Sequence, residues 1–339
     1  MGHVRTLLAS FVPLFYHILS HYFRHAVLEV RREIPRQYDY FDGGASSWDE
    51  YIQRIDRENA PSNLMMTREL LAKNESYVGG LIEQYRRVNI VDIGPGNALP
   101  VRTLLANLIE KSRLGRYIAI DISPEMLRIA KKNIERWFGE RVTFEGYELD
   151  VSRERFANVL VEDHTQISSV PTCNLILFLG GTIQNFRKRD IPLQVINDSM
   201  GPGDFLLHTQ KLDSTATRSQ FDFSTQPGEQ ALPPIHSLVV DLLNIDPTLY
   251  DLELGYDAQK RERYERIRFK TSLSIEFDLQ GGKRLFTINK GEALLLWRAS
   301  QDNAMDVINL FDRNDFCLLQ TSQTEDGEYI LTISRVKRD

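Results

Sequence analysis

The sequence predicts an α/β fold: a doubly wound, mostly parallel sheet completed by a C-terminal antiparallel hairpin, with a second, smaller α+β lobe. Between residues 88 and 211, short runs rich in Ile, Val and Leu alternate with stretches of helical period, which is typical of a parallel sheet covered by helices on both faces. After about residue 212 this alternation stops, and a two-residue period surrounds Gly281-Gly282, as in a long hairpin.

The elements follow from these patterns in chain order. Residues from about 4 to 85 are expected to be mostly helical. Strands are expected at VNIVDIG (88–94), RYIAIDIS (116–123), VTFEGYELD (142–150), CNLILFLGG (173–181) and DFLLHTQK (204–211). Helices are expected at PVRTLLANLIEKSR (100–113), PEMLRIAKKNIERWFG (124–139), IHSLVVDLLNI (235–245) and NAMDVINLFDRNDF (303–316), and a last hairpin at 317–336.

These elements predict four segments. Residues 1–70 form an N-terminal helical segment of the second lobe, and residues 71–210 form the ligand-binding sheet core. Residues 211–300 form an inserted lobe, and residues 301–339 return to complete the core.

Composition and charge argue against several classes of protein. A formal net charge of −6 over 339 residues offers no electrostatic footprint for nucleic acid. Cys173 and Cys317 are too few for a disulfide framework or a cysteine-rich zinc site, so we expect no metal and a reducing cytoplasm. The apolar run at 7–23 is broken by Pro13, which favours an amphipathic helix over a membrane span or signal peptide. We expect a monomer or homodimer; lipidation of Gly2 is an open alternative.

Three consecutive strand ends carry groups suited to an adenosyl ligand. Gly94 and Gly96 follow the first strand and allow backbone N–H groups to approach an anion. A dinucleotide fingerprint needs a third glycine where this chain has Leu99. Asp121 ends the second strand, where it can accept from both hydroxyls of a ribose, and Asp150 ends the third, where it can accept from an adenine amino group or cap its own loop. The set favours S-adenosylmethionine (SAM).

The fourth strand ends in FLGGTIQNF (178–186) at the edge where such sheets bind ligands. Gly180 and Gly181 leave space for a substrate there, and Thr182 and Asn185 can hydrogen-bond to it. The alternative is that Thr182 caps the next helix and Asn185 faces solvent.

This stretch resembles the FLG-[ST]-TI-x-NF motif of the histidine Nα-methyltransferase of ergothioneine biosynthesis and its relatives. Further similar pieces occur in the same order: YDYFDGGASSWDEYI, MTREL, VDIGPGNA, IAIDIS, PGDFLL and NKGEALLL. The resemblance implies a class I SAM-dependent methyltransferase with a Rossmann-like core, and a substrate held between this core and the second lobe. It also implies that Asn185 contacts the α-amino or carboxylate end of an amino acid.

The chain departs from the family where the family holds its substrate. The lysine that helps to bind the SAM carboxylate corresponds to Pro100, so backbone amides or Arg68 are expected to replace it. The tyrosine of the family's AYDD becomes Phe221, and the glutamate and serine that grip the imidazole become Trp297 and Ala299. A pocket without hydrogen-bond partners for an imidazole loses its preference for histidine. It favours an apolar or aromatic side chain, or a cation over the indole.

The expected reaction is methyl transfer to the amine of an amino acid or a related small molecule or peptide, with S-adenosylhomocysteine as product. Alternatives are O-methylation, aminopropyl transfer, and a protein that binds SAM or a partner without catalysis. The catalytic candidates are Tyr40, Thr182 and Asn185, with Asp222 and His208 as further possible bases. The expected cofactor residues are Arg68, Asp92, Gly94, Gly96, Asn97, Asp121, Ile122, Asp150, Val151 and Gly180. The expected substrate residues are Phe41, Gly181, Asn185, Phe221 and Trp297.

Overall fold

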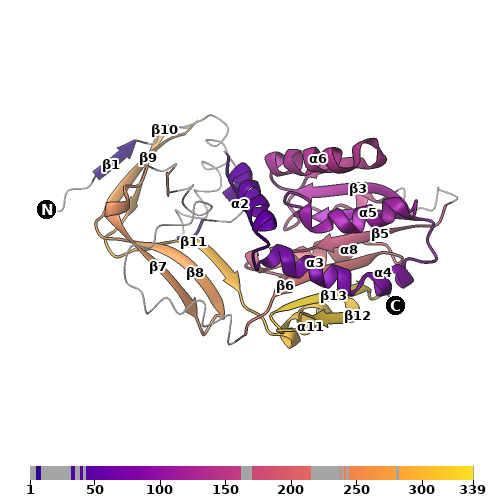
Figure 1. Cartoon of the computed structure of the whole chain (residues 1–339). Coiled ribbons are helices and arrows are strands. Elements are labelled where there is room, and N and C mark those ends of the chain that lie inside the picture. Colours follow the sequence, from indigo (N-terminus) through magenta and orange to yellow (C-terminus); the bar gives the residue numbers. More distant parts are fainter. Residues whose placement is uncertain are drawn as a thin grey trace. The chain divides into compact units, whose positions relative to one another are not determined.

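The structure, a computed structural model, describes residues 5–8, 32–34, 39–40, 43–161, 170–214, 237, 240–241, 244–279 and 282–338. The chain divides into two compact units (Figure 1). The sheet unit comprises Asp49–Thr217 and Gln301–Asp339, and the hairpin unit comprises Met1–Trp48 and Arg218–Ser300. Residues 49–70, which the sequence pattern assigned to the second lobe, therefore lie in the sheet unit.

The sheet unit is built on one seven-stranded sheet in the order β12-β13-β6-β5-β2-β3-β4. Neighbouring strands from β6 to β4 are parallel, whereas β13 runs antiparallel to β6 and β12 antiparallel to β13. The strands are β2 (Arg87–Ile93), β3 (Leu114–Asp121), β4 (Thr143–Glu148), β5 (Thr172–Phe178), β6 (Phe205–Lys211), β12 (Phe316–Gln323) and β13 (Tyr329–Val336). The predicted doubly wound sheet with its C-terminal hairpin is confirmed.

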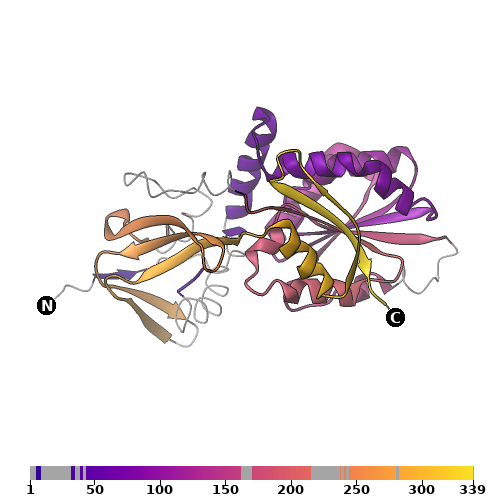
Figure 2. The same ribbon diagram turned by 90° about the horizontal axis from the view of Figure 1, so that it is seen from below.

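Two helix layers cover this sheet, as Figure 2 shows with the sheet seen edge-on. One face packs on α3 (Asn63–Lys73), α4 (Glu75–Leu81), α5 (Arg102–Glu110) and α6 (Pro124–Phe138). The other packs on α8 (Asp190–Ser199) and α11 (Ala304–Asp312). Short 3-10 turns lie between these elements: η3 (Leu99–Val101), η4 (Gly139–Arg141), η5 (Ala157–Val159) and η6 (Thr182–Asn185).

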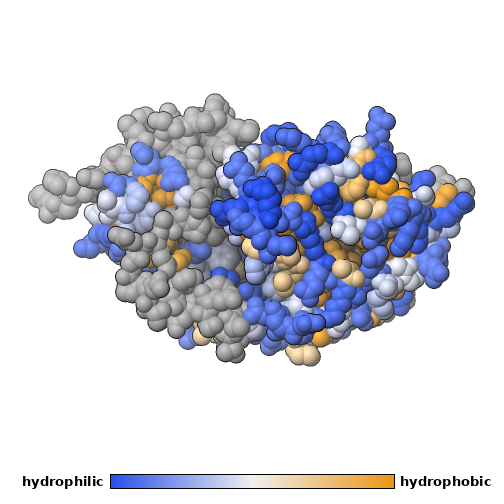
Figure 3. Space-filling view, viewed as in Figure 1, coloured by the Kyte–Doolittle hydropathy of each residue, from blue (hydrophilic) through white to orange (hydrophobic). Residues whose placement is uncertain are grey.

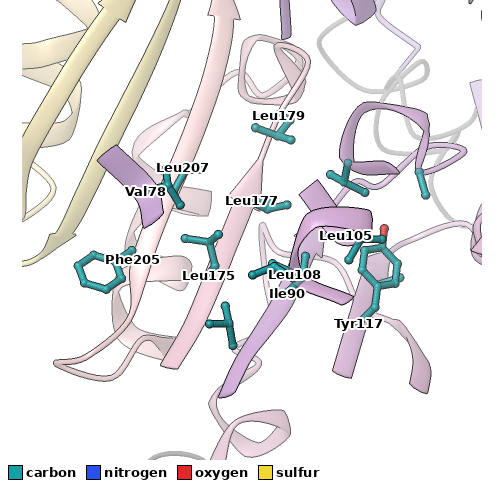
Figure 4. Close-up of a cluster of buried hydrophobic side chains, with 14 of the residues drawn as sticks. Val78, Ile90, Leu105, Leu108, Tyr117, Leu175, Leu177, Leu179, Phe205 and Leu207 are labelled. Carbon is teal, nitrogen blue, oxygen red and sulfur yellow. The ribbon is translucent and has the colours of Figure 1, made fainter. Parts of the chain in front are cut away.

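The central strands are buried on both faces, which is why they read as continuous apolar runs. Figure 4 shows side chains of one face of the core, where Ile90, Leu175 and Leu207 from three neighbouring strands belong to one buried cluster with Leu105 and Leu108 of α5. All five are at most 4% exposed. This packing holds β2 and β5 side by side, and the chain winds outward in opposite directions from that pair. The crevice at their carboxyl ends is the expected ligand site of such a sheet.

The hairpin unit contains two three-stranded sheets, in the orders β1-β9-β10 and β11-β8-β7. Their strands are β1 (Arg5–Leu8), β7 (Tyr250–Asp257), β8 (Glu262–Phe269), β9 (Leu273–Leu279), β10 (Gly282–Ile288) and β11 (Ala293–Ser300), with the 3-10 turn η8 (Pro247–Leu249) before β7. The predicted hairpin around Gly281-Gly282 is confirmed, because β9 and β10 pair antiparallel across it. The helix α2 (Gly44–Glu58) crosses from this unit into the sheet unit.

Two local expectations for this unit differ from the structure. Arg5–Leu8 was expected to be helical but forms a strand parallel to β9, a pairing with a distant segment that local periodicity does not reveal. The pair β7 and β8 was not predicted. The rest of the expected N-terminal helix at 7–23 lies outside the described residues, as does most of the expected helix at 235–245.

The visible face of the sheet unit is mostly hydrophilic, with small apolar areas scattered over it (Figure 3). Its exposed large apolar side chains, Tyr51, Tyr77, Val161 and Met305, come from separate elements. No helix among the described residues is long and apolar enough to cross a membrane. The same residues contain no group of His, Cys, Asp and Glu side chains that could hold a metal ion.

Candidate functional site

The loop after β2 turns sharply at the crevice between β2 and β5. Gly94 and Gly96 have φ values of +65° and +55°, and Ala98 has +62°. Such angles are accessible to glycine at little cost. The backbone N–H of Gly94 donates to the carbonyl of Ile120 over 2.8 Å, which ties the start of the loop to β3.

The loop after β5 approaches the loop after β2 closely. A Cβ atom on Gly94 would lie 3.2 Å from Cγ2 of Thr182, which is tighter than ordinary van der Waals contact. Thr182 also donates its hydroxyl to the carbonyl of Leu179 over 3.0 Å. Side chains three residues apart on a 3-10 turn lie on one side. Asn185, the last residue of η6, is therefore expected on the side of Thr182 that faces the first loop.

The two glycines of the second loop have different surroundings. Gly180 (φ +70°) is exposed, and a Cβ atom on it would meet no atom of the described residues within 4 Å. Gly181 (φ +80°) is buried, and a Cβ atom on it would lie 2.7 Å from Oε1 of Gln184. The space beside Gly181 is thus filled by Gln184, and substrate contact at Gly180 or Gly181 stays a prediction.

Asp121 lies at the tip of β3, next to the glycine loop. Its Oδ1 accepts from the backbone N–H of Ser123 over 2.8 Å, and Ser123 in turn caps α6. Desolvation by burial raises the pKa of Asp121 to about 6, although backbone N–H groups of Ser123 and Ile122 act in the opposite direction. Further hydrogen-bond donors, such as the hydroxyls of a ribose, would stabilise the charged form of this carboxyl.

Asp92 lies beneath the glycine loop and is 3% exposed. The hydroxyl of Tyr117 donates to its Oδ2 over 2.7 Å. Burial raises the pKa of Asp92 to about 7; the Tyr117 hydrogen bond lowers it, and the nearby Asp121 carboxylate adds to the rise. That influence places the two carboxyls in one electrostatic neighbourhood. Asp92 comes two residues before Gly94 and is held by Tyr117, and direct contact with a cofactor stays a prediction.

Asn97 holds the far end of the glycine loop and is fully buried. Its Nδ2 donates to Oδ1 of Asp49 over 2.7 Å, and its carbonyl accepts from Nδ2 of Asn133 over 3.0 Å. Asp49 and Asn133 were not identified from the sequence, because each comes from a distant helix and the YDYFDGGASSWDEYI stretch that contains Asp49 does not show which of its side chains meets this loop.

Arg68 of α3 lies against the same loop. Its guanidinium donates to the carbonyl of Leu99 over 3.3 Å and forms an ion pair with Asp56. The position is compatible with the expected role near the cofactor, but Asp56 already balances part of the charge.

Asp150 has local partners at the end of β4. Its Oδ1 accepts from the backbone N–H and the hydroxyl of Ser152, over 2.9 and 2.6 Å. Its Oδ2 lies 3.4 Å from Nε of Arg153. These contacts are those of a residue that caps its own loop, and the adjacent Val151 is buried. Contact of either residue with adenine stays a prediction.

A further residue at this edge was not identified from the sequence. Asn63, the first residue of α3, donates to the carbonyl of Gly180 over 3.3 Å and accepts from the Tyr329 hydroxyl over 2.7 Å. It links α3, β13 and the double-glycine loop. An asparagine at a helix start carries no distinguishing signal, since its usual role there is capping.

His208 is not available as a base in this structure. It is fully buried in β6, beside Phe178 and Phe311. Burial, with a contribution from Arg189, lowers the pKa of His208 to about 3, so the imidazole is neutral.

Other predicted residues belong to the hairpin unit. Tyr40 packs edge-on against Trp48, with ring centroids 6.3 Å apart. Trp297 lies in β11 beside a bulge, with the Arg263 guanidinium carbon 5.2 Å from its ring centroid. Phe41, Phe221 and Asp222 lie outside the described residues.

Replacement of Asp92 by Asn should flatten the pH dependence of stability. A carboxyl with a folded pKa of about 7 and an unfolded pKa of about 3.9 holds more protons when folded, so the free energy of unfolding falls as pH rises through this window. Asp92→Asn should therefore gain stability relative to wild type between about pH 4 and 7, by on the order of 2–4 kcal/mol. Urea titrations at several pH values measure this.

Tyr117→Phe is the matched variant, because it removes the hydroxyl that lowers this pKa. The free energy of unfolding of Tyr117→Phe should therefore continue to fall as the pH rises above 7. Parallel pH profiles for wild type and Asp92→Asn would contradict the assignment.

Comparison with solved structures finds methyltransferases of low similarity. A SAM-dependent methyltransferase from Clostridium acetobutylicum has 10% identity and a TM-score of 0.47, with 86% of this chain and 100% of that chain covered. The 1,6-didemethyltoxoflavin-N1-methyltransferase of Burkholderia thailandensis, solved with S-adenosylhomocysteine, has 13% identity and a TM-score of 0.42, with 90% and 91% covered. No curated protein matches the chain.

Comparison with protein families finds a match over most of the chain. The model of the family described as histidine-specific, SAM-dependent methyltransferases matches residues 24–336. The sheet order and helix layers above are those of the class I methyltransferase fold, and SAM is the cofactor of this family. The chain therefore belongs to the histidine-specific, SAM-dependent methyltransferase family.

Proposed function

We propose that the protein transfers a methyl group from SAM to the amine nitrogen of an amino acid or a related small molecule or peptide, and that this acceptor is not histidine. The approach of Thr182 to Gly94 carries the proposal. It puts the side of the TIQN turn that bears Thr182 and Asn185 against the loop expected to hold the donor. An acceptor bound by Asn185 would therefore lie next to the donor's methyl group.

The residues of the crevice fit SAM. Gly94 and Gly96 bend the loop so that its backbone could approach a ligand closely, and no described residue comes within 4 Å of a Cβ atom placed on Gly180. The Asp121 carboxyl, at the tip of the next strand, suits the two hydroxyls of the ribose. When bound, SAM supplies a methyl group activated by the positive sulfur. The protein has only to hold this group and the acceptor in line.

Positioning accounts for most of the catalysis we expect from this chain. Alignment of two reactants contributes roughly 7–11 kcal/mol to the lowering of the barrier. An amine reacts only through its free lone pair, so the site must bind the unprotonated form. The carboxamide oxygen of Asn185 would accept an N–H of the amine and direct the lone pair, with Thr182 and Tyr40 as further hydrogen-bonding groups.

The acceptor is proposed to carry an aromatic or apolar side chain. Trp297 and Ala299 stand where the family holds an imidazole with a glutamate and a serine, and neither can replace those hydrogen bonds. Arg263 already lies over the Trp297 ring. One face of the indole thus has a cation from the protein itself, which argues against a cationic side chain there.

An acceptor panel tests the proposal directly. The protein would be incubated with methyl-labelled SAM and with histidine, phenylalanine, tyrosine, tryptophan, lysine, arginine and the corresponding amines. We expect transfer to an aromatic amino acid or amine at a kcat/KM at least about 10-fold above that for histidine. A preference for histidine would contradict the pocket argument. A product methylated only on oxygen would contradict N-methylation and show that the protein is an O-methyltransferase.

Asp121→Ala should weaken binding of SAM and S-adenosylhomocysteine. Loss of charge-assisted hydrogen bonds of about 1.5–3 kcal/mol each corresponds to roughly 10- to 100-fold weaker binding. Calorimetric titration measures this. Asp312→Asn, at the exposed end of α11, is the control and should leave the affinity unchanged. Equal affinity of Asp121→Ala and wild type would remove Asp121 from the cofactor site.

Asn185→Ala should raise the KM of the acceptor about 10-fold or more, since it removes the contact proposed for the amine, and should leave the affinity for S-adenosylhomocysteine within about twofold. Steady-state kinetics with the best acceptor of the panel, together with calorimetry, separate the two effects. Asn107→Ala, on the exposed side of α5, is the matched control. An unchanged KM would reduce Asn185 to a structural role.

A further inference from the structure

We propose that Gln184 is a positioning residue that sets the direction of Asn185, and that its side chain, which occupies the space beside Gly181, adds to the demand of the backbone for glycine at position 181. The inference rests on the proposed function, because it assumes that Asn185 contacts the acceptor. It concerns a residue that touches neither acceptor nor donor.

Gln184 anchors the η6 turn to the end of β6. The side chain is 5% exposed, and its Nε2 donates to the carbonyl of Lys211 over 3.0 Å. Within the turn, the Gln184 N–H donates to the carbonyl of Gly181 over 2.9 Å, and the Gly181 N–H donates to the carbonyl of Thr209 over 2.9 Å. The Gly180 N–H also donates to the hydroxyl of Thr209 over 2.9 Å. The double glycine is thus joined to β6 through its backbone, and the turn through the Gln184 side chain.

Gly181 meets two separate demands. Its φ of +80° lies in the region that favours glycine, and a Cβ atom would stand 2.7 Å from Oε1 of Gln184. The demand set by φ holds for any side chain at position 184. The demand set by the Gln184 contact exists only while the carboxamide lies beneath Gly181, so it couples the stability effects of substitutions at positions 181 and 184.

The geometry of a 3-10 turn transmits this anchor to Asn185. With three residues per turn, successive side chains diverge by about 120°. Gln184 points toward β6, and Thr182 faces Gly94. Three residues per turn would put Asn185 on the same side as Thr182. Fixing the Gln184 carboxamide therefore fixes the rotation of the turn about its axis. Without it, the turn can rotate and carry Asn185 away from its working direction.

Kinetics of two Gln184 variants test the positioning role. Gln184→Ala removes the hydrogen bond and the packing, and Gln184→Met keeps most of the volume but not the N–H donor. For the best acceptor of the panel, kcat/KM should fall about 10- to 100-fold in Gln184→Ala, with a smaller loss in Gln184→Met. The dissociation constant of S-adenosylhomocysteine should stay within about twofold, because Gln184 faces away from the donor loop. Gln323→Ala, at the exposed end of β12, is the control.

A double-mutant cycle tests the coupling without any acceptor. Gly181→Ala should lower the thermal midpoint of the protein without ligand more in the wild-type background than in the Gln184→Ala background, where only the strain at φ +80° remains. If Gly181→Ala fails to fold, the comparison of Gln184→Ala with Gln184→Met still decides between the hydrogen bond and the packing.

Each outcome separates this inference from the proposed function. Additive midpoints in the cycle would overturn the coupling. Coupled midpoints with unchanged acceptor kinetics in Gln184→Ala would make Gln184 structural only and overturn the positioning role, while the proposed function stands. Absence of methyl transfer by the wild type to any member of the panel would overturn the proposed function, and the positioning role with it.

Discussion

The close approach of Gly94 to Thr182 is the constraint on which the rest of the site depends. The loops after β2 and β5 leave neighbouring parallel strands, so both must turn within the same small space. They can do so because Gly94 has no Cβ atom, and one placed there would lie 3.2 Å from the threonine methyl. The glycine is thus required twice, by its φ of +65° and by its neighbour. The contact unites the loop expected to hold a donor with the turn expected to hold an acceptor.

Beneath this contact the protein keeps two carboxyls in an unfavourable environment. Burial raises the pKa of Asp92 to about 7 and that of Asp121 to about 6. Both features lower stability at neutral pH, and buried acids of this kind gather at functional sites. Tyr117 offsets part of the cost at Asp92. The Ser123 N–H does the same at Asp121 and leaves lone pairs for a ligand. The arrangement gives a physical reason for a cofactor to bind at this edge of the sheet.

Most of the sheet unit could be predicted because its elements are encoded locally. The apolar runs that became β2, β3, β5 and β6 are buried on both faces, and their composition shows it. The same reasoning failed where pairing is with a distant segment. β1 pairs with β9, which lies more than 260 residues further along the chain. The local hairpin of β7 and β8 was missed for a different reason, because its side chains alternate between ion pairs such as Glu253 with Arg266 and half-buried apolar groups. Such strands lack the continuous apolar character of the core.

The sequence by itself determined which residue types stand at the strand ends: the glycines of the first loop, Asp121, and the GGTIQN stretch. Local periodicity and strand order were sufficient for this, since parallel strands end at one edge. Only the tertiary structure decided what these groups touch. It placed Thr182 against Gly94, folded Gln184 beneath Gly181 and engaged Asp150 with Ser152. The first of these contacts joins segments far apart in the chain, and the other two depend on rotamers and turn geometry, which no residue pattern specifies.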